Sequence, residues 1–200
     1  LSVTRFTTWA RGPAGPPCAE PARAGGGIVS TARKTREASA TDLAPTAAVR
    51  LRRLMAEGVT TVEIKSGYGL DMATELRMLR IARLIGSTAP VTVKTTFLGA
   101  HALPEEYKGR ADAYIDFVAN EVLPAAAAAG LADAVDAFCE VIGFTPDQTK
   151  RVFASSRARS RSVELCADQP PAFGAAALPA HSCPLSAGHL DSPQCTAVPA

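Results

Sequence analysis

The feature that most constrains the fold of this chain is a repeated alternation of helical and extended patterns between about residues 41 and 169. The helical stretches place apolar residues three and four positions apart, whereas the extended stretches are short and rich in β-branched residues. The expected helices are 41–58, 72–86, 110–130 and one that begins after Thr145, and the expected strands are 59–65, 91–98, 134–141 and 162–167. Because every link between successive strands is long enough to hold a helix, this order predicts an α/β fold with a parallel sheet.

Local signals predict where the helices begin and end. N-cap side chains are expected at Thr41, Asp71 and Thr145, and glycine stops at Gly58 and Gly86. Thr145 and Gln148 have the spacing of a capping box. Pro124 marks a point where the alanine-rich helix 110–130 is open to a break. The interspersed charges of 74–83 predict a solvated helix face.

Charge and cysteine content narrow the class of protein. The net charge is +2, and no basic stripe with interleaved aromatic residues is present, which argues against nucleic-acid binding. No apolar run has the length of a membrane span or of a secretory signal. The five cysteines include no CxxC pair, and their odd number argues against a disulfide framework. These features predict a soluble cytoplasmic protein with no nucleic-acid and no membrane partner.

Polar side chains follow each expected strand. In a β/α barrel the chemistry gathers at the carboxyl ends of the strands and in the loops that follow them. The candidates at these positions are Lys65, Tyr68, His101, Cys139, Glu140, Cys166, Asp168 and Gln169. A later patch, 185–191, contains His189 and is a candidate fifth strand. Together these residues predict an active-site face.

Several of these residues also have a purely structural interpretation. Tyr68 lies between two glycines, where it can offer its hydroxyl to a ligand or simply cover a core edge. His101 is equally open to a structural role. Lys65 is expected to pair with Glu63 or with a neighbouring helix, and Cys139 is expected to be a small buried hydrophobic residue rather than a nucleophile.

Ordered sequence blocks from about residue 24 to residue 154 resemble the imidazolonepropionases, which are metal-dependent amidohydrolases. The blocks are GGGIVSTARKTREAS, TTVEIKSGYGLD, ELRMLRIARLIG, TTFLGAHALPEEYKG and VDAFCEVIGFT. KSGYGL and FLGAHALPEE are the most specific of them. The resemblance implies a TIM-like (β/α) barrel, incomplete in this chain, whose small β-sandwich domain is missing here.

The resemblance also implies an activity and site residues. The implied reaction is hydrolysis of 4-imidazolone-5-propanoate to N-formimidoyl-L-glutamate in histidine degradation, with a zinc or iron ion that activates water. Tyr68, His101 and Gln169 match positions that contact the substrate, and His189 matches a histidine near the catalytic water. Gln169 and His189 are therefore the implied catalytic residues, and a homodimer is the implied assembly.

The chain departs from the family pattern at the metal ligands. It has no His-x-His pair, and Cys166 stands where the family has a histidine ligand in a Leu-His-Ala-Asp motif. We therefore expect a zinc or iron ion not to be bound by this chain as it stands. The predicted organisation is a poorly matching segment 1–23, a partial barrel domain 24–169 and an irregular segment 170–200.

The excess of proline and cysteine in the two flanking segments suggests the hypothesis that frame shifts scrambled them. Two alternatives to an imidazolonepropionase stay open. The first is a related cyclic-amide hydrolase with another substrate, and the second is a catalytically inert fragment that lacks the metal site.

Overall fold

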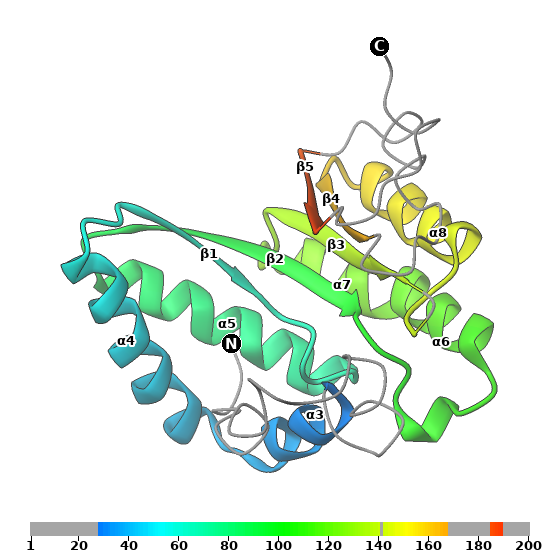
Figure 1. Cartoon of the computed structure of the whole chain (residues 1–200), viewed down its shortest axis with the longest axis horizontal. Helices are drawn as coiled ribbons and strands as arrows, with labels where there is room; N and C mark the ends of the chain where they lie inside the picture. Colours follow the sequence, from blue (N-terminus) through cyan, green and yellow to red (C-terminus); the bar gives the residue numbers. More distant parts are fainter. Residues whose placement is uncertain (1–27, 141, 168–184, 190–200) are drawn as a thin grey trace, which may run out of the picture.

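A computed structural model describes residues 28–140, 142–167 and 185–189, and it contains a parallel sheet with helices along one face (Figure 1). The strands are β1 (Thr61–Lys65), β2 (Thr92–Ala100), β3 (Ala134–Cys139), β4 (Ser162–Ala167) and β5 (Ser186–His189). The helices are α3 (Ile28–Glu37), α4 (Ala40–Ala56), α5 (Met72–Thr88), α6 (Ala111–Phe117), α7 (Leu123–Ala128) and α8 (Pro146–Arg157), with a short 3-10 turn, η1 (Glu105–Tyr107). The predicted α/β class is confirmed.

The strands lie side by side in the order of the sequence, β1-β2-β3-β4-β5, and every neighbouring pair is parallel. Glu63 lies opposite Lys94, and Asp136 lies opposite Glu164. All four expected strands are confirmed, and the candidate fifth strand is present as β5. Parallel strands that follow one another without reversal need crossovers on one side of the sheet, and the helices supply them.

Two helix boundaries differ from the prediction. Ser39, not Thr41, caps α4, because its hydroxyl accepts a bond from the Asp42 N–H at 3.2 Å while the Asp42 carboxylate accepts the Ser39 N–H at 3.0 Å. Gly86 does not stop α5, which continues to Thr88. A Cβ on Gly86 would lie 2.8 Å from the Val93 Cβ, so this glycine lets α5 pack closely on β2. The Asp71 and Thr145 caps are confirmed.

The expected helix 110–130 runs without interruption from Ala111 to Ala128. A π-helical turn, Val118–Val122, lies between α6 and α7, and the backbone keeps right-handed helical angles at both junctions. Pro124 follows this turn and has no N–H to donate to the preceding turn, and the Ala119 carbonyl accepts the Ser155 hydroxyl instead. Pro124 is therefore accommodated by a local change of helix type and does not break the helix.

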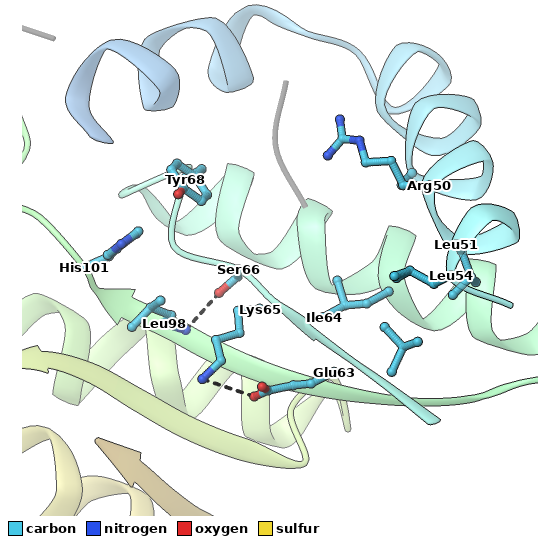
Figure 2. A pocket seen from close by; sticks show the side chains of 12 residues that line it. Arg50, Leu51, Leu54, Glu63, Ile64, Lys65, Ser66, Tyr68, Leu98 and His101 are labelled. Carbon is cyan, nitrogen blue, oxygen red and sulfur yellow. Dashed lines mark hydrogen bonds and ion pairs between the residues drawn. The ribbon is translucent and has the colours of Figure 1, made fainter. Parts of the chain in front are cut away.

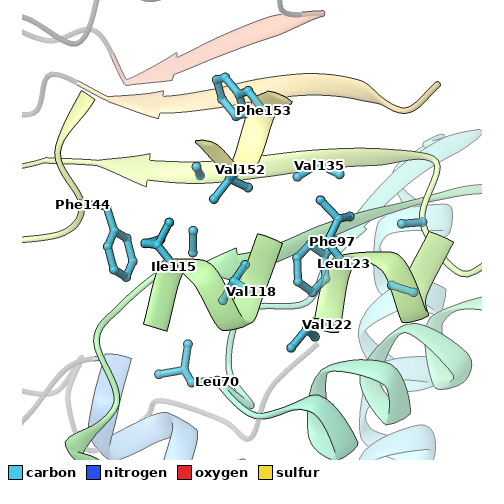
Figure 3. Close-up of a cluster of buried hydrophobic side chains, with 14 of the residues drawn as sticks. Leu70, Phe97, Ile115, Val118, Val122, Leu123, Val135, Phe144, Val152 and Phe153 are labelled. Atoms are coloured by element: carbon cyan, nitrogen blue, oxygen red, sulfur yellow. The ribbon is translucent and has the colours of Figure 1, made fainter. Parts of the chain in front are cut away.

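The helices cover one face of the sheet and enclose the core (Figure 3). Alternate residues of β3 and β4 face them, as the period of a β-strand requires, and an irregularity in β2 brings both Phe97 and Ala100 to the core. This core contains buried side chains from β2, β3 and β4, among them Phe97, Val135, Cys139, Val163 and Leu165. Cys139 is fully buried, which confirms it as a small core residue. A second cluster joins α4 and α5 through Leu43, Leu51 and Ile81.

Many of the intervening strand residues, which lie on the other face of the sheet, are polar. They include Glu63 and Lys65 from β1, Thr96 from β2, Asp136 from β3 and Glu164 from β4. No helix within the described part of the chain combines the length and the apolar character that crossing a membrane requires.

Two features of the helices were not predicted. Helix α3 precedes the region where the periodic pattern was recognised, and it packs near the loop after β1 through a bond from the Arg36 Nε to the Gly69 carbonyl at 2.5 Å. The expectation that 74–83 is simply a solvated face is wrong. Within it, Glu75 is 1% exposed, and Arg77 donates to the carbonyls of Thr35 and Arg36 at the end of α3.

Candidate functional site

Tyr68 and His101 meet at the carboxyl ends of β1 and β2. Each follows its strand, and because the two strands are parallel neighbours their ends lie at the same edge of the sheet. The two rings contact each other edge to face, with centroids 5.0 Å apart. The sequence predicted both residues as substrate-binding candidates, and the structure brings them together (Figure 2).

The His101 ring is fixed from two sides. Its Nδ1 lies 2.8 Å from the Gly67 carbonyl oxygen, and its ring contacts Phe138 edge to face with centroids 5.9 Å apart. A carbonyl oxygen only accepts hydrogen bonds, so Nδ1 is the protonated nitrogen of the neutral ring. The turn after β1 thus sets both the orientation and the tautomer of His101.

Close packing at Gly67 makes this arrangement possible. Its φ is +92°, and a Cβ would lie 2.7 Å from the Leu98 carbonyl oxygen and 3.1 Å from the His101 Nδ1. Only glycine fits a left-handed conformation in contact with two neighbouring groups. Ser66 also connects this turn to β2, because its hydroxyl accepts a hydrogen bond from the Leu98 N–H at 3.0 Å.

A cavity of about 370 Å³ lies beside this pair (Figure 2). Tyr68, His101, Ser66 and Lys65 line one part of it, and Arg50 on α4 lines another. The remaining lining residues are Ala47, Leu51, Leu54, Val62, Glu63, Ile64 and Leu98. The cavity therefore offers hydroxyl, imidazole and cationic groups over a mainly apolar wall, which suits a small polar ligand.

Lys65 lies at the centre of an ion-pair cluster on the polar face of the sheet. Its ammonium is 2.8 Å from Asp136, 2.8 Å from Glu164 and 3.3 Å from Glu63. Its expected pairing with Glu63 is confirmed, and the two other carboxylates are closer. Burial lowers the pKa of Lys65, but the charges and hydrogen bonds of Asp136 and Glu164 outweigh it and raise that pKa above its ordinary value.

The three carboxylates respond differently. Burial raises the pKa of Asp136, although Lys65 opposes it, and the side chain is only 2% exposed. Burial and a hydrogen bond with Glu63 likewise raise the pKa of Glu164, while Glu164, Thr96 and Lys65 together hold the pKa of Glu63 below its ordinary value despite burial. Because Glu63 and Glu164 interact, their carboxylates titrate as a pair rather than as two independent groups.

Cys166 is half-buried in β4, in register with Phe138 of β3 and Gly188 of β5. Burial, and then the nearby Asp136 carboxylate, raise the pKa of its thiol to about 12, whereas Lys65 opposes the shift. A thiol binds zinc as the thiolate. Within the described residues no three histidine, cysteine, aspartate or glutamate side chains come close enough to hold a metal ion.

The remaining predicted residues are placed only in part. His189 is the last residue of β5, where its backbone lies in register with Ala167 of β4. Its side chain lies outside the description, as do Asp168 and Gln169 entirely. Their roles stay predictions.

Three functional groups of the site were not singled out from the sequence. Asp136 and Glu164 are charged residues within otherwise apolar strands, AVDAFC and SVELCA, and that interruption was a usable signal. Glu75 is the third. Its carboxylate reaches back to the loop that contains Tyr68.

Comparison with known proteins reveals extensive similarity to one family. The chain is 57% identical over 188 residues to an imidazolonepropionase of Burkholderia lata, an alignment that covers 94% of this chain and 46% of that protein. It is 58% identical over 172 residues to one from Rhizorhabdus wittichii, and 60% identical over 170 residues to one from Ralstonia nicotianae. These two alignments cover 86% and 85% of this chain and 43% and 42% of the relatives. No family model matches the chain.

These similarities confirm the resemblance inferred from the sequence blocks. The chain spans less than half the length of the relatives. Because 188 of its 200 residues align with the Burkholderia lata protein, both segments that flank 24–169 contain aligned residues. The domain boundaries themselves stay predictions.

Proposed function

We propose, because this chain is homologous to the imidazolonepropionases, that it is part of a hydrolase that opens the ring amide of 4-imidazolone-5-propanoate to give N-formimidoyl-L-glutamate. The observation that carries this proposal is the contact between Tyr68 and His101 at the carboxyl ends of adjacent parallel strands, beside a cavity. Both residues belong to the blocks in which the resemblance is most specific.

The chemistry of the pair suits such a substrate. The Tyr68 hydroxyl both donates and accepts hydrogen bonds, and the cavity beside it is large enough for one small ring. A proton on Nδ1 of His101 directs the acceptor nitrogen of the ring away from Gly67. In this proposal Tyr68 and His101 orient the imidazolone ring, and the apolar wall packs against it.

The sheet supports an incomplete barrel. Sequential parallel strands with helices on a single face are the arrangement of a (β/α) barrel rather than of a doubly wound sheet, which has helices on both faces. The polar face with Lys65 and Asp136 would be the barrel interior. The β-sandwich domain, a homodimeric assembly and a cytoplasmic location are further parts of the proposal, and they rest on the family resemblance.

The donor groups described here do not fit the zinc or iron site that the resemblance implies. Cys166 stands at the position of a histidine ligand, and no cluster of three donors surrounds it within the described residues. What the described residues supply is substrate orientation.

The test is calorimetric titration of the purified chain with 4-imidazolone-5-propanoate, followed by an assay of ring opening. We expect Tyr68→Phe to weaken binding about 10-fold, the value of one hydrogen bond to a polar ligand, and His101→Ala to weaken it at least as much. Tyr107→Phe is the matched control, since Tyr107 packs against Tyr114 and Phe117 rather than in the cavity. Binding that neither Tyr68→Phe nor His101→Ala changes would exclude this pair as the substrate site.

A second experiment tests the identity of the substrate. A panel of other cyclic amides separates this substrate from those of related hydrolases.

A further inference from the structure

Glu75 is a buried acid that accepts three backbone hydrogen bonds from the loop carrying Tyr68. One carboxylate oxygen accepts the Gly67 N–H at 2.8 Å. The other accepts the Gly69 N–H at 2.7 Å and the Leu70 N–H at 2.9 Å. Glu75 is 1% exposed, so these bonds lie away from water, where a buried carboxylate needs such donors.

The loop has a backbone that needs external support. Gly67 and Leu70 both have positive φ, +92° and +58°, and for a non-glycine residue such as Leu70 this conformation is disfavoured. Tyr68 lies between Gly67 and Gly69, and each of these glycines donates to a different oxygen of Glu75. A single carboxylate therefore holds the backbone on both sides of Tyr68.

The same contacts extend to His101. Gly67 donates its N–H to Glu75 and accepts the Nδ1 proton of His101 at its carbonyl oxygen. A displacement of Gly67 would change the His101 hydrogen bond and the ring contact between His101 and Tyr68. Helix α5 thereby controls the geometry of two residues that it does not itself carry.

We propose that Glu75 is a positioning residue of the candidate site, which fixes the Tyr68 loop and, through Gly67, the orientation and tautomer of His101. The expected effect of Glu75 on substrate binding rests on the proposed function. Its effect on the Tyr68 loop and on His101 does not depend on that function. A merely structural Glu75 would stabilise the chain without affecting the state of the His101 ring.

Nitrogen NMR of the histidine rings separates these possibilities, because the ring shifts report which nitrogen carries the proton. In the unmodified protein at a pH where the ring is neutral, we expect His101 to show the Nδ1–H tautomer. Glu75→Gln keeps the size of the side chain but replaces one of its two acceptor oxygens with an N–H₂ group, which cannot accept a bond from the loop amides. We expect this variant to shift His101 toward a mixture of tautomers and to weaken binding of 4-imidazolone-5-propanoate.

Asp71→Asn is the matched control. Asp71 caps the same helix and pairs with Arg36, but it makes no bond to the loop amides of Gly67, Gly69 or Leu70. We expect it to lower the urea midpoint while leaving the His101 tautomer unchanged. Unchanged His101 ring shifts in a folded Glu75→Gln protein would overturn the proposal, even if binding is lost.

Amide hydrogen exchange in the unmodified protein provides a second test that does not require a variant to fold. The Gly67, Gly69 and Leu70 amides should exchange at least about 100-fold more slowly than freely exposed amides, since opening the Glu75 contacts must precede exchange. Rapid exchange of all three would contradict the proposed anchoring. If this protection and the tautomer shift are observed but no ligand binds, the proposed function fails and the positioning role of Glu75 stands.

Discussion

The ammonium of Lys65 and a carboxylate oxygen of Asp136 lie 2.8 Å apart across the polar face of the sheet, on strands separated by β2. Asp136 is 2% exposed, whereas Lys65 retains 35% exposure. Lys65 thus brings the compensating charge to a carboxylate that water scarcely reaches. Removing one partner of such a pair costs more than the pair contributes, because it leaves a buried charge uncompensated.

Lys65→Met is therefore expected to lower the free energy of unfolding by about 2–3 kcal/mol, less than for a fully buried pair because Lys65 is partly exposed. Urea unfolding measures this, with Lys108→Met as the control at an exposed ion pair. The double variant Lys65→Met/Asp136→Asn should recover part of the loss.

The loss of stability in Lys65→Met should also depend on pH. Because burial raises the pKa of Asp136, this loss should shrink as pH falls and Asp136 of the folded state takes up a proton. A penalty that is independent of pH would contradict this account.

The contact between Tyr68 and His101 could be predicted from the sequence in outline. The strands are recognisable from their composition, and residues that follow adjacent parallel strands meet at one edge. The Lys65 cluster could not be predicted so directly, because it depends on the register that places Asp136 opposite Glu164. A single sequence contains no direct information on the register between strands distant in the chain.

The role of Glu75 could not be predicted from the sequence for a different physical reason. On a helix with several arginines, an acidic residue has the pattern of a solvated face, and helical periodicity does not show that a loop before the helix folds back over it. Only the left-handed turn at Gly67 and Leu70 directs the loop amides toward Glu75. The start of helix α4 also differs from the prediction, because Ser39 and Asp42 form a capping box that competes with Thr41.

The ionised carboxylate of Asp133 should stabilise the folded state, and this contribution should be lost in acid. Burial opposes its ionisation, but two bonds from the Arg83 guanidinium at 2.8 Å and 3.0 Å and one from the Thr95 N–H at 2.8 Å hold its pKa below the ordinary value of 3.8. The contribution is therefore fully present above pH 3.8 and is lost as pH falls through the lower folded-state pKa.

Asp133→Asn should consequently cost about 1 kcal/mol at neutral pH, a figure reduced for partial exposure, and progressively less in acid. Chemical unfolding at a series of pH values tests this, with the exposed Asp147→Asn as a control expected to cost little at any pH. A cost that grows as pH falls would have the wrong sign for a depressed pKa.

Cys166 should react slowly with alkylating reagents in the folded chain. Burial and Asp136 raise its pKa from 9.0 to about 12, which reduces the thiolate fraction near neutral pH by a factor on the order of 1,000. Iodoacetamide labelling followed by peptide mass mapping gives the rate at this residue. The same measurement in denaturant provides the control, where the rate should rise to that of an ordinary thiol. Equal rates in the folded and unfolded chain would show that the sheet does not suppress the thiolate.

Gly67→Ala and Gly109→Ala form a matched pair that separates backbone strain from steric contact. Both glycines have left-handed backbones, with φ of +92° and +72°. A Cβ on Gly109 would meet nothing within 4 Å, so that substitution should cost only about 1 kcal/mol of conformational strain. A Cβ on Gly67 would lie 2.7 Å from the Leu98 carbonyl oxygen, a backbone atom that cannot move without disturbing β2.

We therefore expect Gly67→Ala to lower the free energy of unfolding by about 3 kcal/mol, the sum of strain and overpacking, and to displace His101 from its bond to the Gly67 carbonyl. Urea unfolding of both variants measures the difference, and the His101 ring shifts report the displacement. Equal costs for the two alanines would mean that the loop moves away from Leu98 freely. In that case the close contact beneath Tyr68 would not determine the geometry of the site.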